Sequence, residues 1–271
     1  LRESFDQAKP NLLLSAAVAA PAPIANKAYD VNPFNKYLDY VQIMNYDFHM
    51  YSKLEPCTGF NAPLFSKQYE FGILSKMNSD YSTQHWLERG LWANKTIFGI
   101  PTYGRGYTLL NKYFHFLYAP AVGHANIGAA YPFVCNLTKT KNYKYVFDEK
   151  TRSAYIHGGD RQWLGLENPI TMFTKASYIK TYNLAGIMIY DLASDDYKVL
   201  LVTPCLCSDE WHHKIRSIIG RCPVIFDIQL MVLVEKLDVF YKNYVKSWET
   251  SGDDLKLGSS SKEAETWPTR I

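Results

Sequence analysis

The sequence predicts an α/β fold, with a parallel sheet or barrel that carries an antiparallel insertion. Continuous apolar runs alternate with segments of helical spacing, which is typical of parallel strands joined by helices. Before the last of these runs, apolar and polar residues alternate around two turn signals, as they do in antiparallel hairpins. Polar and aromatic residues follow three of the runs, and in an α/β barrel such strand ends meet at one face.

Four apolar runs are the predicted strands of the parallel sheet. In chain order they are NLLLSAAVAA (11–20), YVQIMNY (40–46), TIFGIPTYG (96–104) and LAGIMIYDL (184–192). Runs of this kind are expected where a strand is buried on both faces. We therefore expect the four runs to form one parallel sheet.

Three segments have the spacing of amphipathic helices. Residues 79–92 form the first, with Ser79 as the expected N-cap, and residues 171–182 form the second. The third is a long helix over 226–248, whose apolar stripe is expected to contact the core or a partner. The polar residues 251–271 are expected to be disordered.

The stretch YKYVFDEKTRSAYIHGGDRQWLGL, within residues 131–168, predicts the antiparallel part. Apolar and polar residues alternate along it, and DEKT and HGGD are turn signals. We expect a set of antiparallel hairpins inserted before the last parallel strand.

Composition argues against several functional classes. The net charge is +3, from 29 basic and 26 acidic residues, which is too small for a nucleic-acid surface. The long apolar stretch near residue 230 is interrupted by charges, so no membrane span is expected. The five cysteines lack C-x-x-C spacing, so no metal is expected. No cofactor is expected either. Aromatic residues make up 15% of the chain, and such rings suit both protein cores and the apolar faces of sugars.

Three strand-end clusters are the candidate site: MNYDFH (44–49), PTYGR (101–105) and MIYDLASDD (188–196). If they lie at the same end of neighbouring strands, they line one cavity. The alternative is that their tyrosines close the barrel mouth and their aspartates cap helices or face solvent. The aspartates concerned are Asp47, Asp191, Asp195 and Asp196.

Six phrases together resemble glycoside hydrolase family 18, the chitinases and chitinase-like lectins. They are LLLSAAVAA, YVQIMNYDFH, TGFNAPL, IFGIPTYGRGYTL, YIHGGDRQWLGLEN and LAGIMIYDLASDDY, and the similarity covers about residues 1–200. The resemblance implies a partial (β/α)8 TIM barrel, with strands five to eight present and an α+β insertion after strand seven.

The resemblance also implies a division of the chain into four parts. Residues 1–108 would hold strands five to seven, and 109–168 the insertion. Residues 169–222 would hold strand eight and a closing helix, and 223–271 the amphipathic helix and polar tail.

Family membership would assign roles to the strand-end residues. Met44, Tyr46 and Asp47 match the family's M-x-Y-D, in which the tyrosine and aspartate contact the N-acetyl group of the sugar. Tyr103 and Arg105 match residues that line the substrate groove. At the position of the floor tryptophan on strand eight, this chain has Tyr190, whose smaller ring would stack less strongly.

The family cleaves β-1,4-linked N-acetylglucosamine polymers, chitin among them, by substrate-assisted retaining hydrolysis. The general acid is the glutamate that ends a D-x-x-D-x-D-x-E motif on strand four, and this motif is absent from the 271 residues. Glu55 and Glu70 have no matching context to replace it. We therefore expect this chain alone to be inactive, and two interpretations stay open: part of a chitinase, or a non-catalytic carbohydrate-binding lectin.

Further expectations concern secretion and packing. Cys135 matches a family cysteine that would pair with Cys205 or Cys207, although a buried free thiol is the alternative. Asn94 and Asn136 begin glycosylation sequons. With the family, these features predict an extracellular protein, although the opening LRESFDQAKP does not read as a signal peptide.

Other expectations concern the shape of the half barrel. Met50 replaces a family glycine, and His49 is expected to be a packed structural residue. The half barrel would have two unpaired edges and an apolar inner face, which predicts self-association and poor solubility.

Overall fold

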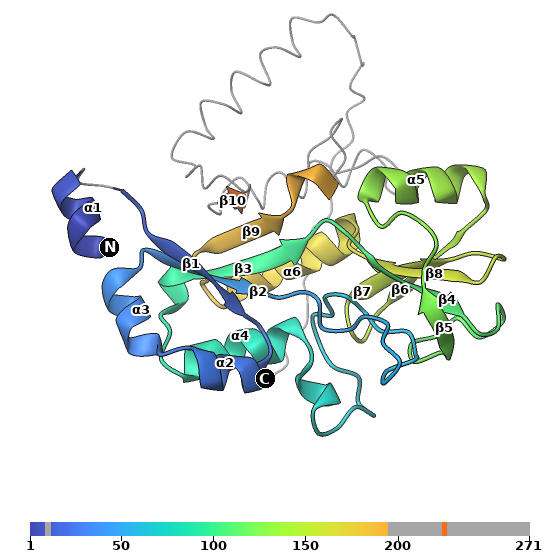
Figure 1. The fold of residues 1–271 in the computed structure, drawn as a ribbon, viewed down its shortest axis with the longest axis horizontal. Helices are drawn as coiled ribbons and strands as arrows, with labels where there is room; N and C mark the ends of the chain where they lie inside the picture. The colour runs from blue at the N-terminus through green and yellow to red at the C-terminus, as the bar shows by residue number, and fades with distance from the viewer. Residues whose placement is uncertain (9–11, 195–223, 227–271) are drawn as a thin grey trace, which may run out of the picture. The chain divides into compact units, whose positions relative to one another are not determined.

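A computed structural model describes residues 1–8, 12–194 and 224–226, and Figure 1 shows its ribbon. The predicted helix over 226–248 and the polar tail lie outside these residues, except for Phe226. None of the helices in the described part is long and apolar enough to cross a bilayer.

The predicted parallel sheet is present, with strand order β1-β2-β3-β9-β10 and parallel pairing throughout. Its strands are β1 (Ser15–Ala19), β2 (Tyr40–Met44), β3 (Thr96–Pro101), β9 (Gly186–Tyr190) and β10 (Val224–Phe226). The first four are the predicted apolar runs. The short strand β10 was not predicted, and it pairs with the edge of β9 that was expected to be unpaired.

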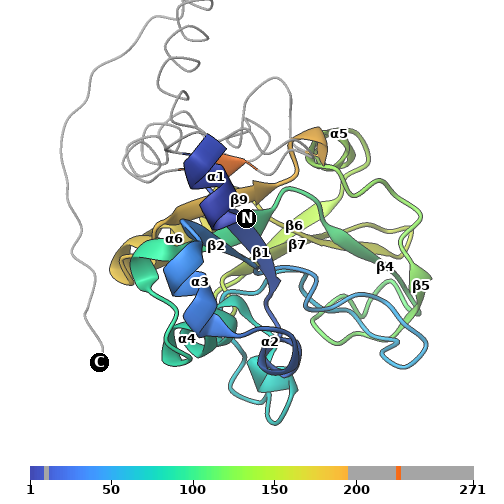
Figure 2. The same ribbon diagram turned by 60° about the vertical axis from the view of Figure 1, so that its left-hand side comes forward.

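Helices cover one face of this sheet. They are α2 (Ala22–Ala28), α3 (Val31–Tyr37), α4 (Ser79–Glu88) and α6 (Pro169–Thr181), and a further helix α1 (Arg2–Ala8) precedes β1. Figure 1 and Figure 2 both show α2 and α4 on the same side of β1 and β2. Val41 and Ile43 pack with Trp86 of α4, whereas Ile187 and Ile189 pack with α6.

The start of α4 corrects one expectation. The N-cap is Asn78, whose side-chain oxygen accepts a hydrogen bond from the backbone N–H of Tyr81, and Ser79 is the first helical residue. Asparagine and serine are both good N-caps, so the residue pattern did not distinguish the two neighbours.

The other face of the parallel sheet is less apolar than expected. Its side chains alternate with those beneath the helices, and Gln42, Ile97 and Met188 lie on it. The amide of Gln42 donates a hydrogen bond to the hydroxyl of Ser15 on the neighbouring strand. The expected apolar inner face is therefore interrupted by a polar pair.

The predicted hairpins form a second, antiparallel sheet with strand order β5-β4-β8-β7-β6. Its elements are β4 (Arg105–Leu109), β5 (Ala121–His124), helix α5 (Tyr131–Thr140), β6 (Lys144–Asp148), β7 (Ser153–His157) and β8 (Gln162–Leu166). Aromatic side chains fill its core, with Tyr107 and Trp163 fully buried. This sheet begins at Arg105, before the expected boundary at 109, and the division into domains stays a prediction.

The PTYGR segment joins the two sheets. Pro101 ends β3, Arg105 begins β4, and only Thr102, Tyr103 and Gly104 lie between them. A Cβ atom on Gly104 would lie 2.5 Å from the carbonyl oxygen of Gly165, so only glycine allows this approach. The short connection places Tyr103 and Arg105 at the junction of the sheets.

Candidate functional site

The structure brings the three strand-end clusters together. We call the group formed by Tyr46, Asp47, Tyr103, Arg105 and Tyr190 the strand-end site. The ring of Tyr46 stacks on that of Tyr190, with centroids 5.7 Å apart and planes 12° apart. Tyr103 meets Tyr46 and Tyr190 edge-on, at 6.1 and 6.3 Å. The residues just beyond β2, those at the β3–β4 connection and the last residue of β9 therefore form one cluster.

The tyrosines differ in exposure. Tyr46 is 8% exposed and packs with Ile97 and Met188, with the half-buried Met44 beside them. Tyr190 is 39% exposed, so part of its ring remains open to a ligand. Gly99 of β3 allows this packing, because a Cβ atom there would lie 2.8 Å from Cε of Met188 and 3.2 Å from a ring carbon of Tyr46.

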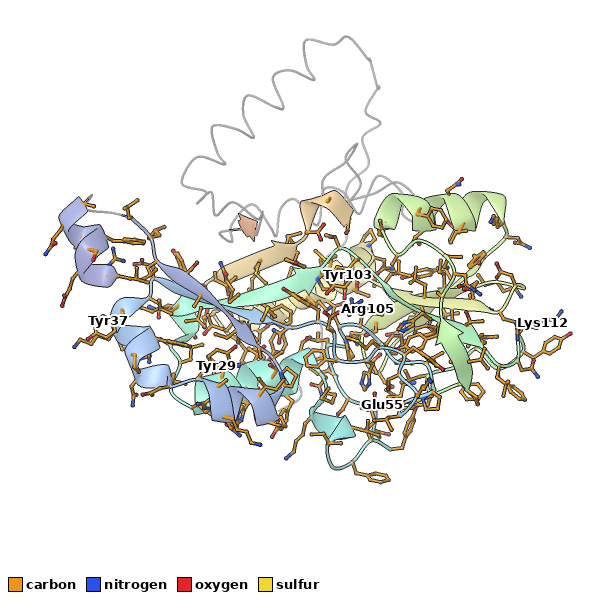
Figure 3. All side chains as sticks on the ribbon, in the orientation of Figure 1. Tyr29, Tyr37, Glu55, Tyr103, Arg105 and Lys112 are labelled. Carbon is orange, nitrogen blue, oxygen red and sulfur yellow. The ribbon has the colours of Figure 1, made fainter. Side chains whose placement is uncertain are left out.

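Asp47 is the polar centre of the strand-end site. Its Oδ1 accepts hydrogen bonds from the hydroxyl of Tyr103 at 2.9 Å and from Nε of Arg105 at 2.8 Å. Nη2 of Arg105 lies 2.7 Å from the same oxygen. Within the described part of the chain, no hydrogen bond reaches Oδ2 of Asp47. Figure 3 shows Tyr103 and Arg105 next to each other where the two sheets meet.

The backbone of Asp47 is in the left-handed region, at φ 60°. Aspartate is among the few residues with a side chain that tolerate this region. The conformation turns the chain away from β2 immediately after Tyr46.

Electrostatics keep the partners of Asp47 in fixed protonation states. Burial raises the pKa of Tyr103, and the Asp47 carboxylate raises it further, so the phenol remains a donor. Burial alone would lower the pKa of Arg105, but its hydrogen bond to Asp47 and the carboxylate charge outweigh this and raise it. The guanidinium therefore stays positive and also lies over the Tyr103 ring, 5.1 Å from its centroid.

Asn61 was missed as a site residue. Its side-chain oxygen accepts from the backbone N–H of Asp47 at 2.9 Å, and its amide donates to the carbonyl oxygen of Tyr103 at 3.1 Å. Asn61 is only 3% exposed. A lone polar residue within the apolar GFNAPL was the available signal, since buried polar side chains must find partners.

The third cluster contributes its tyrosine but not its first aspartate. Asp191 accepts a hydrogen bond from the backbone N–H of Ser194, in the short 3₁₀ helix Leu192–Ser194. The interpretation as a cap therefore holds for Asp191. Asp195 and Asp196 lie outside the described residues.

The glutamates near the site are occupied or distant. Glu70 accepts from the hydroxyl of Tyr118 and from the backbone N–H of Lys67. Glu167 forms an ion pair with the fully buried Lys175. Figure 3 shows Glu55 apart from Tyr103 and Arg105, on the loop after β2. None of these three carboxyl groups is placed to donate a proton to a ligand at Asp47.

Two neighbouring residues in the loop after β2 have no polar role at the site. His49 packs against Gly59, where a Cβ atom would lie 2.4 Å from that of His49, and burial lowers its pKa to about 4. The imidazole is therefore neutral at neutral pH, as suits a structural residue. Met50 is exposed.

The remaining predicted residues stay predictions. Cys135 lies in α5, and Cys205 and Cys207 lie outside the described residues, so their pairing is untested. Asn94 and Asn136 are both exposed, as glycosylation would require. Among the described residues, no group of three histidine, cysteine or acidic side chains is arranged to hold a metal ion.

Comparisons with known proteins identify relatives for most of the chain. The family model for glycosyl hydrolases family 18 matches residues 1–195. Chitotriosidase-1 of Mus musculus is 34% identical over 204 residues, which is 72% of this chain and 42% of the relative. Human chitinase-3-like protein 2 is 31% identical over 197 residues, covering 70% and 50% of the two chains. The chain thus spans half or less of these relatives.

Solved structures show the same fold. Human YKL-39, described as a pseudo-chitinase with retained chitooligosaccharide binding properties, matches at 28% identity and a TM-score of 0.71. The match covers 81% of this chain and 62% of that one. A group IV chitinase of Ostrinia furnacalis in complex with allosamidin matches at 29% identity, a TM-score of 0.69, and 81% and 59% coverage. The predicted fold class, a partial TIM barrel with an inserted domain, is confirmed.

Proposed function

The chain belongs to the glycosyl hydrolases of family 18, and we propose that its strand-end site binds β-1,4-linked N-acetylglucosamine oligomers. One observation carries this proposal. The partly exposed Tyr190 lies edge-on to Tyr103, whose hydroxyl donates a hydrogen bond to Asp47. Only one carboxylate oxygen of Asp47 accepts hydrogen bonds from the described residues.

The aromatic part suits a sugar ring. Tyr46 supports Tyr190 on one side, and the exposed part of Tyr190 offers an apolar surface to the axial C–H groups of a pyranose. Met44 packs against the buried cluster to which Tyr46 belongs. Tyr190 stands where the family usually has tryptophan, so we expect weaker stacking than in tryptophan-bearing relatives.

The polar part suits a neutral ligand with hydroxyl and acetamido groups. Oδ1 of Asp47 is occupied by Tyr103 and Arg105, whereas Oδ2 can accept a hydrogen bond from a ligand O–H or N–H. Because Arg105 balances the carboxylate charge, no ligand charge is needed. Fixed donors and acceptors of this kind favour one orientation of the sugar.

Cleavage by this chain alone is not part of the proposal. Substrate-assisted hydrolysis needs a carboxylic acid within hydrogen-bond reach of the glycosidic oxygen. The 271 residues lack the D-x-x-D-x-D-x-E motif, and Glu167 is neutralised by Lys175. Chitin-directed hydrolysis is the second candidate function. It is favoured by the intact Tyr46, Asp47, Tyr103 and Arg105 arrangement, but it requires an acid from elsewhere.

Calorimetric titration with N,N′,N″,N‴-tetraacetylchitotetraose tests the binding, and a reducing-end assay on the same samples tests cleavage. Cellotetraose is the matched control, because it keeps the β-1,4 glucan chain and lacks the acetamido groups. We expect the first ligand to bind, the second to bind much more weakly, and neither to be cleaved. Equal affinities would contradict recognition of the acetamido group, and turnover would favour the second candidate.

We propose two further properties, one of location and one of assembly. An extracellular location is supported by the exposed sequon residues Asn94 and Asn136 and by relatives named oviduct-specific glycoprotein. Self-association is proposed through β1, the outer strand of the described parallel sheet, since the outer edge of β9 is paired with β10. Light scattering over a concentration series tests it, and a monomer at every concentration would contradict it.

A further inference from the structure

We infer that Asn61 is a positioning residue, which holds Asp47 at a fixed place relative to Tyr103 and Arg105. This inference rests on the proposed binding at the strand-end site. Asn61 lies in the TGFNAPL segment, to which the proposed binding assigns no role. Asn61 belongs to neither β2 nor β3, yet it bonds to the chain just beyond both.

Three hydrogen bonds make this connection. The Asn61 side chain accepts from the N–H of Asp47 and donates to the carbonyl oxygen of Tyr103, at 2.9 and 3.1 Å. Its backbone oxygen accepts from the N–H of Phe48 at 3.0 Å. Because β2 ends at Met44, the N–H of Asp47 has no partner in a neighbouring strand, and Asn61 supplies one.

The segment that carries Asn61 is itself anchored. The ammonium group of Lys175, fully buried in α6, donates to the carbonyl oxygen of Ala62 at 2.8 Å. The same ammonium pairs with Glu167, which accepts a further hydrogen bond from Thr171 at 2.6 Å. A charged hydrogen bond to the next residue therefore limits the movement of Asn61.

These contacts explain how Asp47 can present one oxygen only. Tyr103 and Arg105 both approach Oδ1, which leaves Oδ2 open only while the Asp47 backbone keeps its position. Without Asn61, the N–H of Asp47 and the carbonyl of Tyr103 lose their partner at the same time. The carboxylate can then shift and lose its alignment with Arg105.

The test compares two buried asparagines. Asn78 is also 3% exposed. Its side chain accepts a hydrogen bond from the backbone N–H of Tyr81 and donates one to the backbone carbonyl of Ser75. It caps α4 rather than contacting the strand-end site. Asn78→Ala therefore removes the same number of bonds as Asn61→Ala and serves as the matched control.

Two readouts are used on the full chain with ¹⁵N-arginine labelling. The first is the Nε–H signal of Arg105, assigned by its loss in Arg105→Lys, and its rate of exchange with water. The second is the affinity for tetraacetylchitotetraose. We expect Asn61→Ala to speed Arg105 Nε–H exchange and to weaken affinity by about tenfold or more, whereas Asn78→Ala lowers Tm and changes neither.

The outcomes separate the two proposals. If Asn61→Ala behaves like Asn78→Ala in both readouts, the positioning role is wrong. If the wild-type chain does not bind the sugar, the proposed function fails, while the Arg105 signal still decides the role of Asn61. Should Asn61→Ala not fold, hydrogen exchange of the Asp47 amide in the wild type decides instead. Slow exchange is expected, and a rate equal to that of an open loop amide would overturn the inference.

Discussion

Two ion pairs of this chain connect strand ends to neighbouring elements, and they are built in opposite ways. Arg105 and Asp47 are both about one-third exposed, at 36% and 34%, and lie where a ligand can reach them. Lys175 and Glu167 are 0% and 10% exposed and lie beneath the segment that holds Asn61. The open pair gains little stability from its charges, whereas the buried pair cannot lose one partner without leaving the other desolvated.

This difference separates the pair in the proposed binding site from the pair that supports it. The exposed pair has unused hydrogen-bonding capacity, because Oδ2 of Asp47 accepts no hydrogen bond from the described residues. Each member of the buried pair has a further protein partner, the carbonyl oxygen of Ala62 for Lys175 and the hydroxyl of Thr171 for Glu167. A ligand therefore competes with water at the first pair and does not disturb the second.

The largest effect is expected from Lys175→Met, which would leave the Glu167 carboxylate buried without its cation. We expect a loss of roughly 3–5 kcal/mol in the free energy of unfolding, measured by urea denaturation. The control is Lys175→Met combined with Glu167→Gln, which removes both charges and should recover much of the loss. If Lys175→Met alone is as stable as the wild type, the buried pair is not the support described above.

We expect acid to lower the stability of the fold through buried histidines and not through the Arg105–Asp47 pair. His157 stacks on His115 at 3.6 Å, and burial, followed by the charges of His115 and Lys144, lowers its pKa to about 4. The unfolded chain, with a histidine pKa near 6.5, then binds the proton more readily between these values, so stability falls as pH drops from about 6.5 towards 4.

The variant His157→Gln checks this assignment. Its Tm should fall less than that of the wild type over the same pH range, as followed by circular dichroism. His49 contributes in the same direction, because its pKa is also lowered to about 4 by burial. An unchanged profile in His157→Gln would assign the acid sensitivity to His49 or to carboxylates.

A smaller effect on stability is expected from Asp47→Asn. The amide keeps an acceptor for Tyr103 but loses the charge that aligns Arg105, so we expect a change below about 1 kcal/mol in unfolding. Affinity for tetraacetylchitotetraose should fall by about tenfold, which calorimetry measures. A loss of stability as large as that of Lys175→Met would remove the distinction between the two pairs.

The smallest effect is expected at a third pair, Arg152 with Glu149, in the turn between β6 and β7. Glu149 is 72% exposed, so water already satisfies its carboxylate. Glu149→Gln should change the free energy of unfolding by less than about 0.5 kcal/mol. A larger change in the same urea assay would show that exposure alone does not rank these pairs.

Much of the fold was predictable because the spacing of apolar residues in the sequence matches the side chains that the structure buries. The four parallel strands and the hairpins of 143–166 are continuous or alternating apolar runs, and the structure contains them. Convergence of strand ends was enough to bring Tyr46, Asp47, Tyr103, Arg105 and Tyr190 together.

The misses have physical causes. Strand β10 has three residues, too few to show a period, and its place depends on pairing with β9. Lys175 is a residue type that is rarely buried, so its position in α6 did not indicate an internal charge. Asn61 lies in a loop without periodicity, and its partners, Asp47 and Tyr103, follow two different strands.

The short link between the sheets has a consequence for protein engineering. Tyr103 lies in the three-residue connection, and Arg105 is the first residue of β4. The antiparallel sheet therefore cannot be exchanged without affecting the strand-end site. A chimera that exchanged this sheet between relatives at residue 105 would bring the relative's residue at position 105 into the strand-end site. A junction placed after Gly106 would instead cut through β4 and separate most of that strand from Arg105. Exchange of the antiparallel sheet would therefore also change the proposed sugar-binding site.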